Sequence, residues 1–507
     1  MIMKADDCVS IKDLIDALQL PNAYPHPVEA PIVVHETHIS VVFLAGDFAY
    51  KIKKPIQTDF LNYSTLDRRK HFCEEEVRLD GRYADDLYLG VVSVTRDKGL
   101  ITIQGAGETI EYAVKMRRFP AHALLSERVA TGKLTSSEVL LLAKIIADFH
   151  HDAVVCKDEI ASQWPDFLAK NTEQLLATLR ETTEPQTAAT LEVLGNWADD
   201  FFSQNWQTLT ERINSGHIRE CHGDLHLANV VYWQGQLVPF DGIEFNDHLR
   251  CIDVLSDTVF LAMDLAARGH LDLSRSFLNA YLEQTGDYQS LNLLRLFQCY
   301  RSLVRAMAAS MRSDAEDAHQ HIDLAYRFTL RESPRLWITH GVSGSGKTTL
   351  SEAVVQRHDA IRLRSDIERK RLYGLSPTQR PTSELSASMY GSAANERTYQ
   401  RLIDLAGGIL RAGYSVIVDA TFLKKSDRDR FHDLAIQEGV SFAILNCFVD
   451  AQTLRQRVTD RAAHGDDASD ADLTVLEYQL THREPLSDAE RQHVTEIPNP
   501  TQIAEHL

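Results

Sequence analysis

Residues 341–349 read GVSGSGKTT, and this short segment restricts the possible fold of the chain more than any other feature. It fits the Walker A pattern G-x-x-x-x-G-K-[ST] through Gly341, Gly346, Lys347 and Thr348. The preceding residues RLWITH are apolar enough for a buried strand, and a helical pattern follows the loop. A strand, a glycine-rich loop and a helix in this order predict a phosphate-binding loop at the edge of a parallel sheet.

Each part of this loop has a predicted task in binding a nucleotide. Backbone N–H groups can surround phosphate oxygens, and the N-terminus of the helix adds positive potential. Lys347 would reach the terminal phosphates, and Thr348 would bind Mg2+. A dinucleotide-binding fingerprint fits less well, because its glycine spacing is absent. We therefore expect ATP and Mg2+ as cofactors, with this nucleotide-binding set: Gly341, Ser343, Gly344, Ser345, Gly346, Lys347, Thr348 and Thr349.

After the loop, strand and helix patterns alternate along the chain. Strands are predicted at 360–364, 414–420 and 441–449, and helices near 393–412, 426–438 and 451–462. Such alternation predicts a parallel sheet flanked by helices, with ligands at the carboxyl ends of the strands. Asp419, in VIVDAT, is predicted to hold the Mg2+ shell, and Asp366, after IRLRS, to orient or deprotonate an acceptor hydroxyl. A helix cap or a strand terminator is the alternative for either acid.

Two arginines complete the predicted C-terminal site. Arg457 and Arg461 are four residues apart, so they share a helix face from which they could close over the transferred phosphate. Residues 335 to 507 resemble the small P-loop kinases that include gluconate kinases, zeta toxins and polynucleotide kinases, a type grouped with AAA ATPases. The resemblance rests on GVSGSGKTT, the Ser365-Asp366 pair and VIVDAT. It implies phosphorylation of a hydroxyl group and leaves the acceptor open.

A second motif, HGDLHLANVVYWQGQLVPFDGIEF, occupies residues 222–245. Asp224 and Asn229 are five residues apart, and Asp241 follows two short predicted strands that turn at Gln234-Gly235. Protein kinases use this spacing for a catalytic Asp, a metal-binding Asn and a metal-binding Asp. The carboxylate orients the hydroxyl, while Mg2+ on the other two side chains neutralises the phosphates. A polar hairpin beside a capped helix is the alternative interpretation.

The same segment resembles the aminoglycoside phosphotransferase and choline kinase group, which shares the protein-kinase fold. The residues that carry the resemblance are His222, Gly223, Asp224, His226 and Asn229. It extends over about residues 30 to 330. It implies that Asp224 is the catalytic carboxylate and that Asn229 and Asp241 are metal ligands, with Glu244 as an additional candidate for the metal site.

A fold of this kind also needs a strand lysine for the α- and β-phosphates and a helix glutamate that pairs with it. AYKIKKP offers Lys51 and Lys53 on one strand face, and FCEEEV offers Glu74, Glu75 and Glu76. We favour Lys51 and Glu75, and the neighbouring choices stay open. No G-x-G-x-x-G cover loop precedes the lysines, as is general among the antibiotic kinases of this group.

The remaining patterns predict the domain organisation. Strand patterns lie within 36–55 and across 89–119, a helix pattern lies at 64–84, and a mainly helical stretch runs from about 134 to 330. The helical stretch ends near Ser333-Pro334. We therefore predict an α/β multidomain protein, with a protein-kinase-like α+β domain at 1–330 and a P-loop NTPase domain with a parallel sheet at 331–507.

Charge and cysteine content limit the classes of binding partner and the cellular compartment that we expect for this protein. The 507 residues include 72 acidic and 53 basic side chains, a net charge of -19, which argues against nucleic acid and anionic membranes as partners. The acidic segment HGDDASDAD at 464–472 opposes a polynucleotide kinase in particular. Because no signal peptide begins the chain and no apolar run reaches about eighteen residues, a cytoplasmic protein is expected. Seven scattered cysteines without a CxxC pair predict reduced, buried thiols.

These observations predict a bifunctional ATP-dependent kinase. Each of its two nucleotide sites would transfer the γ-phosphate of MgATP to a hydroxyl group of a small molecule. In the alternative, one module is an active kinase and the other is a nucleotide-gated regulatory or binding domain. The presence of Asp224, Asn229 and Asp241 together favours an active N-terminal module. The sequence indicates neither the acceptors nor the oligomeric state.

Overall fold

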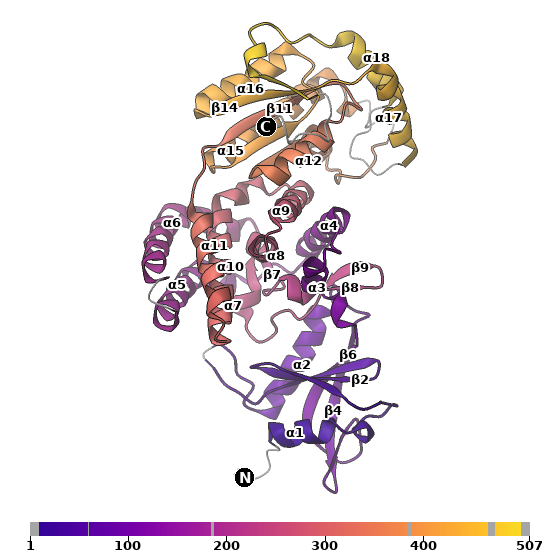
Figure 1. Ribbon diagram of the computed structural model, residues 1–507, viewed down its shortest axis with the longest axis vertical. Coiled ribbons are helices and arrows are strands. Elements are labelled where there is room, and N and C mark those ends of the chain that lie inside the picture. Colours follow the sequence, from indigo (N-terminus) through magenta and orange to yellow (C-terminus); the bar gives the residue numbers. More distant parts are fainter. Residues whose placement is uncertain are drawn as a thin grey trace. The chain divides into compact units, whose positions relative to one another are not determined.

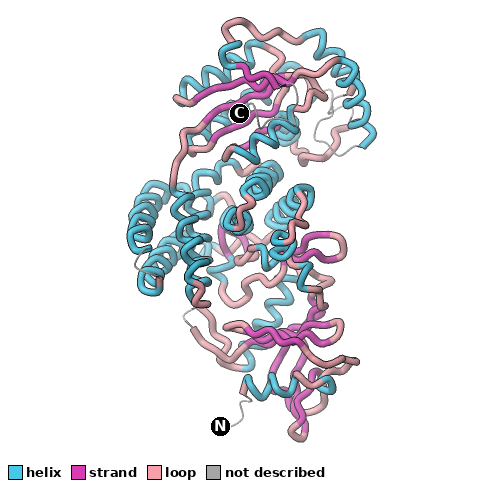
Figure 2. The backbone as a smooth tube through the Cα atoms, in the orientation of Figure 1, coloured by secondary structure: helices cyan, strands magenta, loops and turns pink. Residues whose placement is uncertain are grey.

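The computed structural model describes residues 10–58, 60–183, 187–382, 385, 388–464 and 472–497 (Figures 1 and 2). The chain forms two compact units. The first comprises Met1–Glu138, Asp148–Asn171 and Leu209–Leu261, and the second comprises Val139–Ala147, Thr172–Thr208 and Ala262–Leu507. The second unit thus includes helices that precede residue 331, and the domain division at that residue stays a prediction. Most of the acidic segment at 464–472 lies outside the described residues.

An antiparallel sheet forms the N-terminal part of the first unit. Its strand order is β1-β2-β3-β6-β4-β5, with bounds Val33–Glu36, Ser40–Ala45, Phe48–Lys53, Glu108–Arg117, Tyr88–Asp97 and Leu100–Ile103. Side chains of a strand alternate between its faces. Tyr50 and Ile52 of β3 therefore pack with helix α1 (Ile11–Leu18), whereas Ala49 packs on the other side with Cys73 of helix α2 (Leu66–Asp80). The strands and the helix predicted here are confirmed.

The predicted hairpin of the second motif is also confirmed. Strands β8 (Val230–Trp233) and β9 (Gln236–Pro239) pair in antiparallel fashion, and Gln234 and Gly235 between them have φ values of 49° and 92°. Before and after the hairpin, β7 (Ile218–Glu220) pairs with β10 (Cys251–Asp253). The β7–β10 ladder therefore joins the two ends of the segment that carries the predicted catalytic residues, and the β8–β9 hairpin lies within this segment.

The stretch from 134 to 330 is mainly helical, as the sequence predicts. Its helices are α4 (Ser136–Asp152), α5 (Asp158–Thr182), α6 (Ala188–Asn214), α7 (Asp247–Arg250), α8 (Val254–Ala267), α9 (Leu271–Thr285), α10 (Leu291–Met311) and α11 (Ala315–Thr329). A short helix, α3 (Leu125–Ala130), precedes them. In the second unit, α5, α6, α10 and α11 share an apolar core that includes Leu176, Leu191, Leu303 and Ile322.

The C-terminal region contains the expected parallel sheet. Its order is β12-β13-β11-β14-β15, with bounds Ala360–Arg364, Ser415–Asp419, Arg335–His340, Ser441–Cys447 and Val494–Ile497. The accompanying helices are α12 (Lys347–Arg357), α13 (Ser365–Leu372), α15 (Ser392–Arg411), α16 (Lys425–Glu438), α17 (Ala451–His464) and α18 (Leu473–His482). Neither β15 nor α18 is among the predicted elements. The fold class is therefore the predicted combination of an α+β domain and a parallel α/β domain.

The expectation that all cysteines are reduced thiols is wrong for one pair. Cys156 and Cys251 form a disulfide across 95 residues of sequence, with their Cα atoms 5.9 Å apart. The backbone N–H of Cys156 donates to the carbonyl of Ile218 in β7, and β7 pairs with β10, which carries Cys251. Tertiary pairing thus creates a proximity that sequence spacing does not reveal. Among the described helices, none is long and apolar enough to cross a membrane.

Candidate functional site

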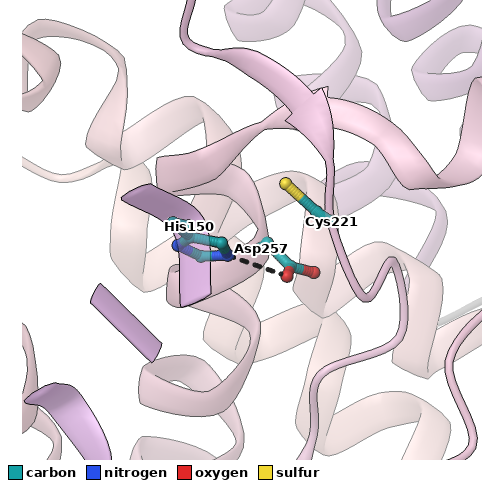
Figure 3. Close-up of side chains that lie close together, drawn as sticks. All are labelled: His150, Cys221 and Asp257. Atoms are coloured by element: carbon teal, nitrogen blue, oxygen red, sulfur yellow. Dashed lines mark hydrogen bonds and ion pairs between the residues drawn. The ribbon is translucent and has the colours of Figure 1, made fainter. Parts of the chain in front are cut away.

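A buried carboxylate at the start of α8 holds the backbone of the HGD segment. Asp257 accepts hydrogen bonds from the backbone N–H of His222 at 3.1 Å and of Gly223 at 2.9 Å. Its carboxylate also contacts Nε2 of His150 at 3.1 Å (Figure 3). His150, Cys221 and Asp257 offer possible metal-ligand atoms within 4.8 Å of one another. Because N–H donors already engage the Asp257 carboxylate, we assign this cluster a hydrogen-bonding role in shaping the loop.

The structure brings the predicted catalytic and metal-binding residues of this segment together. The side-chain amide of Asn229 donates to the backbone carbonyl and to the carboxylate of Asp224, both at 3.0 Å. The Asp224 side chain is 38% exposed, so it can reach a substrate. Phe240 donates its backbone N–H to the carbonyl of Asn229 at 3.0 Å, which places Asn229 beside the residue before Asp241. All three predicted side chains therefore belong to one local site.

Lys51 joins this site to helix α2. Its ammonium group pairs with Asp241 and lies 3.0 Å from a carboxylate oxygen of Glu76. Burial alone would lower the pKa of Lys51, but Asp241 and Glu76 outweigh that effect and hold the pKa well above its usual value. The lysine therefore stays charged, as a phosphate-binding lysine must.

The prediction of Glu75 as the partner of Lys51 is wrong by one residue. The carboxylate of Glu75 instead pairs with Arg78 at 2.8 Å. The buried face of α2 contains Arg69, Cys73, Glu76 and Asp80, whose spacings of three and four residues are those of one helix face. Glu75 is off this face. The helical period places Glu76 on one face with Cys73, and packing of α2 against the sheet decides that this face is the buried one.

A second buried lysine extends the network, and sequence reasoning left its role open. Lys53 lies 2.6 Å from the second carboxylate oxygen of Glu76 and also pairs with Glu244. Tyr63 donates its hydroxyl to the same Glu244 oxygen. Both Lys53 and Glu244 are almost completely buried. The structure thus shows Glu244 in an ion pair, and its participation in a metal site stays a prediction.

Asp241 has a backbone conformation that its surroundings must stabilise. Its φ of 63° is in the left-handed region, which is uncommon for a residue with a side chain. The hydroxyl of Tyr88 accepts its backbone N–H at 3.0 Å, and Asp80 of α2 accepts the N–H of Gly242 at 2.9 Å. Burial, with a smaller contribution from the charge of Glu76, raises the pKa of Asp80 to about 8. Asp80 therefore supports the turn mainly as a neutral carboxylic acid near neutral pH.

In the C-terminal site, the loop between β11 and α12 has the geometry that its glycines allow. At Gly341, with φ of 149°, an added Cβ would lie 2.6 Å from the Ser345 hydroxyl and 2.7 Å from the carbonyl oxygen of Cys447. Gly346 begins α12 with a left-handed φ of 94°. Lys347 donates to the carbonyl of Val342 at 2.9 Å. The loop therefore folds back over its own lysine, next to the N-terminus of α12.

The metal-binding residues predicted for this loop are in contact. The hydroxyl of Thr348 donates to the Asp419 carboxylate at 2.9 Å, and Ser351 donates to the same oxygen at 3.3 Å. Asp419 ends β13 in register with Arg364 of β12, and the Arg364 Nε lies 3.9 Å from that carboxylate. Asp366 follows two residues later, at the beginning of α13 and half-buried. The predicted acceptor and metal acids thus lie at the carboxyl ends of neighbouring strands.

Two helices between β14 and β15 also contact the loop. Arg457 of α17 donates to the carbonyl of Gly344 at 3.4 Å, and its role toward the phosphates stays a prediction. The side chain of Arg461 lies outside the described residues. Gln479 of α18 accepts the backbone N–H of Ser343 at 2.8 Å. Sequence reasoning missed Gln479, since α18 was not predicted and a glutamine has no distinctive motif.

Both sites offer the chemistry that Mg2+ requires. The N-terminal site supplies the Asp241 carboxylate and the amide oxygen of Asn229, and the C-terminal site supplies the Thr348 hydroxyl and the Asp419 carboxylate. These are hard oxygen ligands, few enough to leave positions for phosphate oxygens and water. The residues therefore fit the predicted cofactor, which would neutralise phosphate charge when bound.

Comparison with known proteins adds a family match and several likenesses. Residues 336–486 match the family model described as an AAA domain, which confirms the expected resemblance of the C-terminal region to P-loop proteins. Over 460 residues, the chain is 29% identical to an uncharacterized protein of Mycobacterium tuberculosis, a match that covers 88% of this chain and 90% of that protein.

Solved structures similar to parts of this chain include two kinases. A gluconokinase from Sinorhizobium meliloti 1021 has 19% identity and a TM-score of 0.25, covering 34% of this chain and 90% of its own. A Plasmodium vivax ethanolamine kinase has 12% identity and a TM-score of 0.38, covering 60% of this chain and 83% of its own.

Proposed function

We propose that this protein is an ATP-dependent kinase with two nucleotide sites, each of which transfers the γ-phosphate of MgATP to a hydroxyl group of a small molecule. At the N-terminal site, Asp224 orients the acceptor hydroxyl and takes its proton, while Lys51 and the metal ligands hold the phosphates. At the C-terminal site, Asp366 has the acceptor role, and Lys347, Thr348 and Asp419 hold MgATP.

One observation carries the proposal: each site combines a lysine, two oxygen donors for Mg2+ and a carboxylate at the position predicted for the acceptor. In the N-terminal site, Lys51 contacts Asp241 and Asn229 contacts Asp224. In the C-terminal site, Thr348 contacts Asp419, and Asp366 stands at the next strand end. Phosphoryl transfer relies on positioning and on neutralising charge, and these parts meet both requirements.

The acidic composition supports a small acceptor. A net charge of -19 repels polyanions, so nucleic acid is a poor partner in both sites. The family match over 336–486 supports nucleotide binding in the C-terminal region. We place the protein in the cytoplasm, where MgATP is available.

Calorimetry with a non-hydrolysable ATP analogue and Mg2+ tests the number of sites. The whole chain should bind close to two molecules, and Lys347→Ala and Asp241→Ala should each remove one of them. A stoichiometry of one that neither substitution changes would contradict the proposal. A metabolite-pool screen with labelled ATP, run in parallel on Asp224→Asn and Asp366→Ala chains, would assign each phosphorylated product to its site. Filter binding of labelled DNA and RNA at low salt would detect a polynucleotide acceptor instead.

A further inference from the structure

Strand β12 is an edge strand of the parallel sheet, and a helix side chain occupies its open side. The strand pairs with β13 on one side only. On the other side, the Asn279 amide of α9 donates to the carbonyl of Ala360 at 3.1 Å and accepts the N–H of Arg362 at 2.7 Å. An edge strand exposes such groups in a row. Asn279, which is 2% exposed, thus replaces the donor and acceptor of a missing neighbour strand.

A buried ion pair strengthens this contact. Arg362 points from β12 to Glu283, one helical turn after Asn279 on α9, with its Nε 2.6 Å from the carboxylate. The guanidinium also lies 2.7 Å from Glu352 of α12. Arg362 and Glu283 are both buried, so water cannot replace either partner. Removal of one partner from a buried pair leaves an uncompensated charge.

The same helix also contacts the element that follows β12. Arg371 of α13 donates to the backbone carbonyl of Glu283 at 2.5 Å. Asp366 is located between these contacts, after the end of β12 and in the first turn of α13. Helix α9 therefore holds the chain on both sides of the carboxylate that we assign to the acceptor. Figure 1 shows α9 next to α12 of the same unit.

We propose that α9 belongs to the working unit of the C-terminal kinase, with Asn279 and Glu283 as positioning residues for Asp366. This inference rests on the proposed function of the P-loop region. The two side chains bond to β12, whereas Lys347 and Thr348 are in the first turn of α12. A displacement of about 1 Å can reduce turnover about 100-fold, so a loosened β12 should impair transfer more than ATP binding. A fragment that begins at residue 331 would lack both positioning residues.

The test uses the whole chain with Asp224→Asn, so that the N-terminal site does not contribute. Asn279→Leu removes both hydrogen bonds to β12, and Glu283→Gln is a milder change that keeps the side-chain length. Asn292→Ala, in the exposed first turn of α10, is the matched control. One readout is hydrogen exchange of residues 360–366 without nucleotide. The other is the kinetics of ATP hydrolysis, with water as the acceptor, together with the KM for ATP.

The inference predicts faster exchange at Arg362 and a loss of kcat of about 10-fold to 100-fold, with the KM for ATP within about 3-fold of the parent value. Asn292→Ala should match the parent in both readouts. Unchanged exchange and kcat in Asn279→Leu and Glu283→Gln would overturn the inference. Loss of ATP binding as severe as in Lys347→Ala would also overturn it, because α9 would then serve the whole domain. If Lys347→Ala leaves ATP hydrolysis unchanged, the proposed P-loop function fails. The contact of α9 with β12 is judged separately, by whether hydrogen exchange of residues 360–366 becomes faster in Asn279→Leu.

Discussion

Lys51 on strand β3 lies 3.0 Å from Glu76 on helix α2, and the other carboxylate oxygen of Glu76 lies 2.6 Å from Lys53. One glutamate therefore pairs with two lysines that are adjacent on the same strand face. Lys51 also forms an ion pair with Asp241, and Lys53 forms one with Glu244. The charges that would hold phosphates and metal at the N-terminal site are thus interdependent, and Glu76 is their common partner.

Glu76→Gln should strongly reduce both phosphoryl transfer at the N-terminal site and stability. The substitution leaves two buried lysines with less compensating charge, and breaking such a pair typically costs about 3 kcal/mol or more. Glu75→Gln is the matched control, since Glu75 pairs with Arg78 near the surface. Its effect on stability should be about 1 kcal/mol or less. Urea unfolding and labelled-ATP transfer, measured on both variants, would contradict the assignment if Glu75→Gln were the more damaging change.

Asp224→Asn should keep nucleotide binding at the N-terminal site and lose transfer. The amide is nearly isosteric with the carboxylate but cannot accept the proton of the hydroxyl. The expected loss of turnover is on the order of 100-fold or more. The assay needs Lys347→Ala in the background, so that the C-terminal site does not contribute. Transfer at the parent rate would show that Asp224 has only a structural role.

Lys347→Ala and Asp366→Ala should separate nucleotide binding from acceptor chemistry at the C-terminal site. Loss of the lysine charge should weaken both ATP affinity and turnover, because we propose that this charge binds the terminal phosphates. Asp366→Ala should leave ATP affinity within a few-fold and abolish transfer. Calorimetry and transfer assays on the whole chain, with Asp224→Asn present, provide the comparison. An equal loss of ATP affinity in the two variants would give Asp366 a metal-binding or folding role.

Asp80 should make stability depend on pH. Burial raises the pKa of Asp80 to about 8 in the folded chain, compared with about 4 for an exposed aspartate. Between these values the folded state binds one more proton than the unfolded state, so this residue's contribution to the free energy of unfolding falls as pH rises from about 4 to about 8. Asp80→Asn should remove this contribution, and the exposed control Asp86→Asn should retain it. Urea unfolding at pH 5 and pH 8.5 without Mg2+ measures the change in the free energy of unfolding. If this free energy changed equally with pH in Asp80→Asn and in the parent, the predicted role of Asp80 would be refuted.

The disulfide can be tested by counting thiols. Because Cys156 and Cys251 are bonded, the unfolded protein should gain two titratable thiols after treatment with a reductant. Closure of a loop of 95 residues stabilises the folded chain, and reduction should therefore lower the Tm. A Cys156→Ala chain should show no response of Tm to the reductant. An unchanged thiol count in the parent chain would mean that the pair is reduced in the isolated protein.

The sequence by itself determined those parts of the sites that depend on spacing along the chain. Strand and helix periods predicted the two sheets, and the second motif placed Asp224 near Asn229 because the two residues lie in one short segment. Thr348 and Asp419 are 71 residues apart, and the predicted parallel sheet placed them at one edge, where the carboxyl ends of its strands meet. Apolar alternation likewise placed Lys51 and Lys53 on one strand face.

Tertiary structure decided the contacts between elements that are distant in sequence. Which glutamate meets Lys51 depends on how α2 is rotated against the sheet, and burial of Arg69, Cys73 and Asp80 selects Glu76. The hydrogen bonds of Asn279 to β12 and the bond between Cys156 and Cys251 join segments 81 to 95 residues apart. No periodicity specifies such pairs, because they depend on packing that brings each buried polar group a partner. The sequence therefore contained the chemistry of both sites, and only the fold showed which side chains hold that chemistry in place.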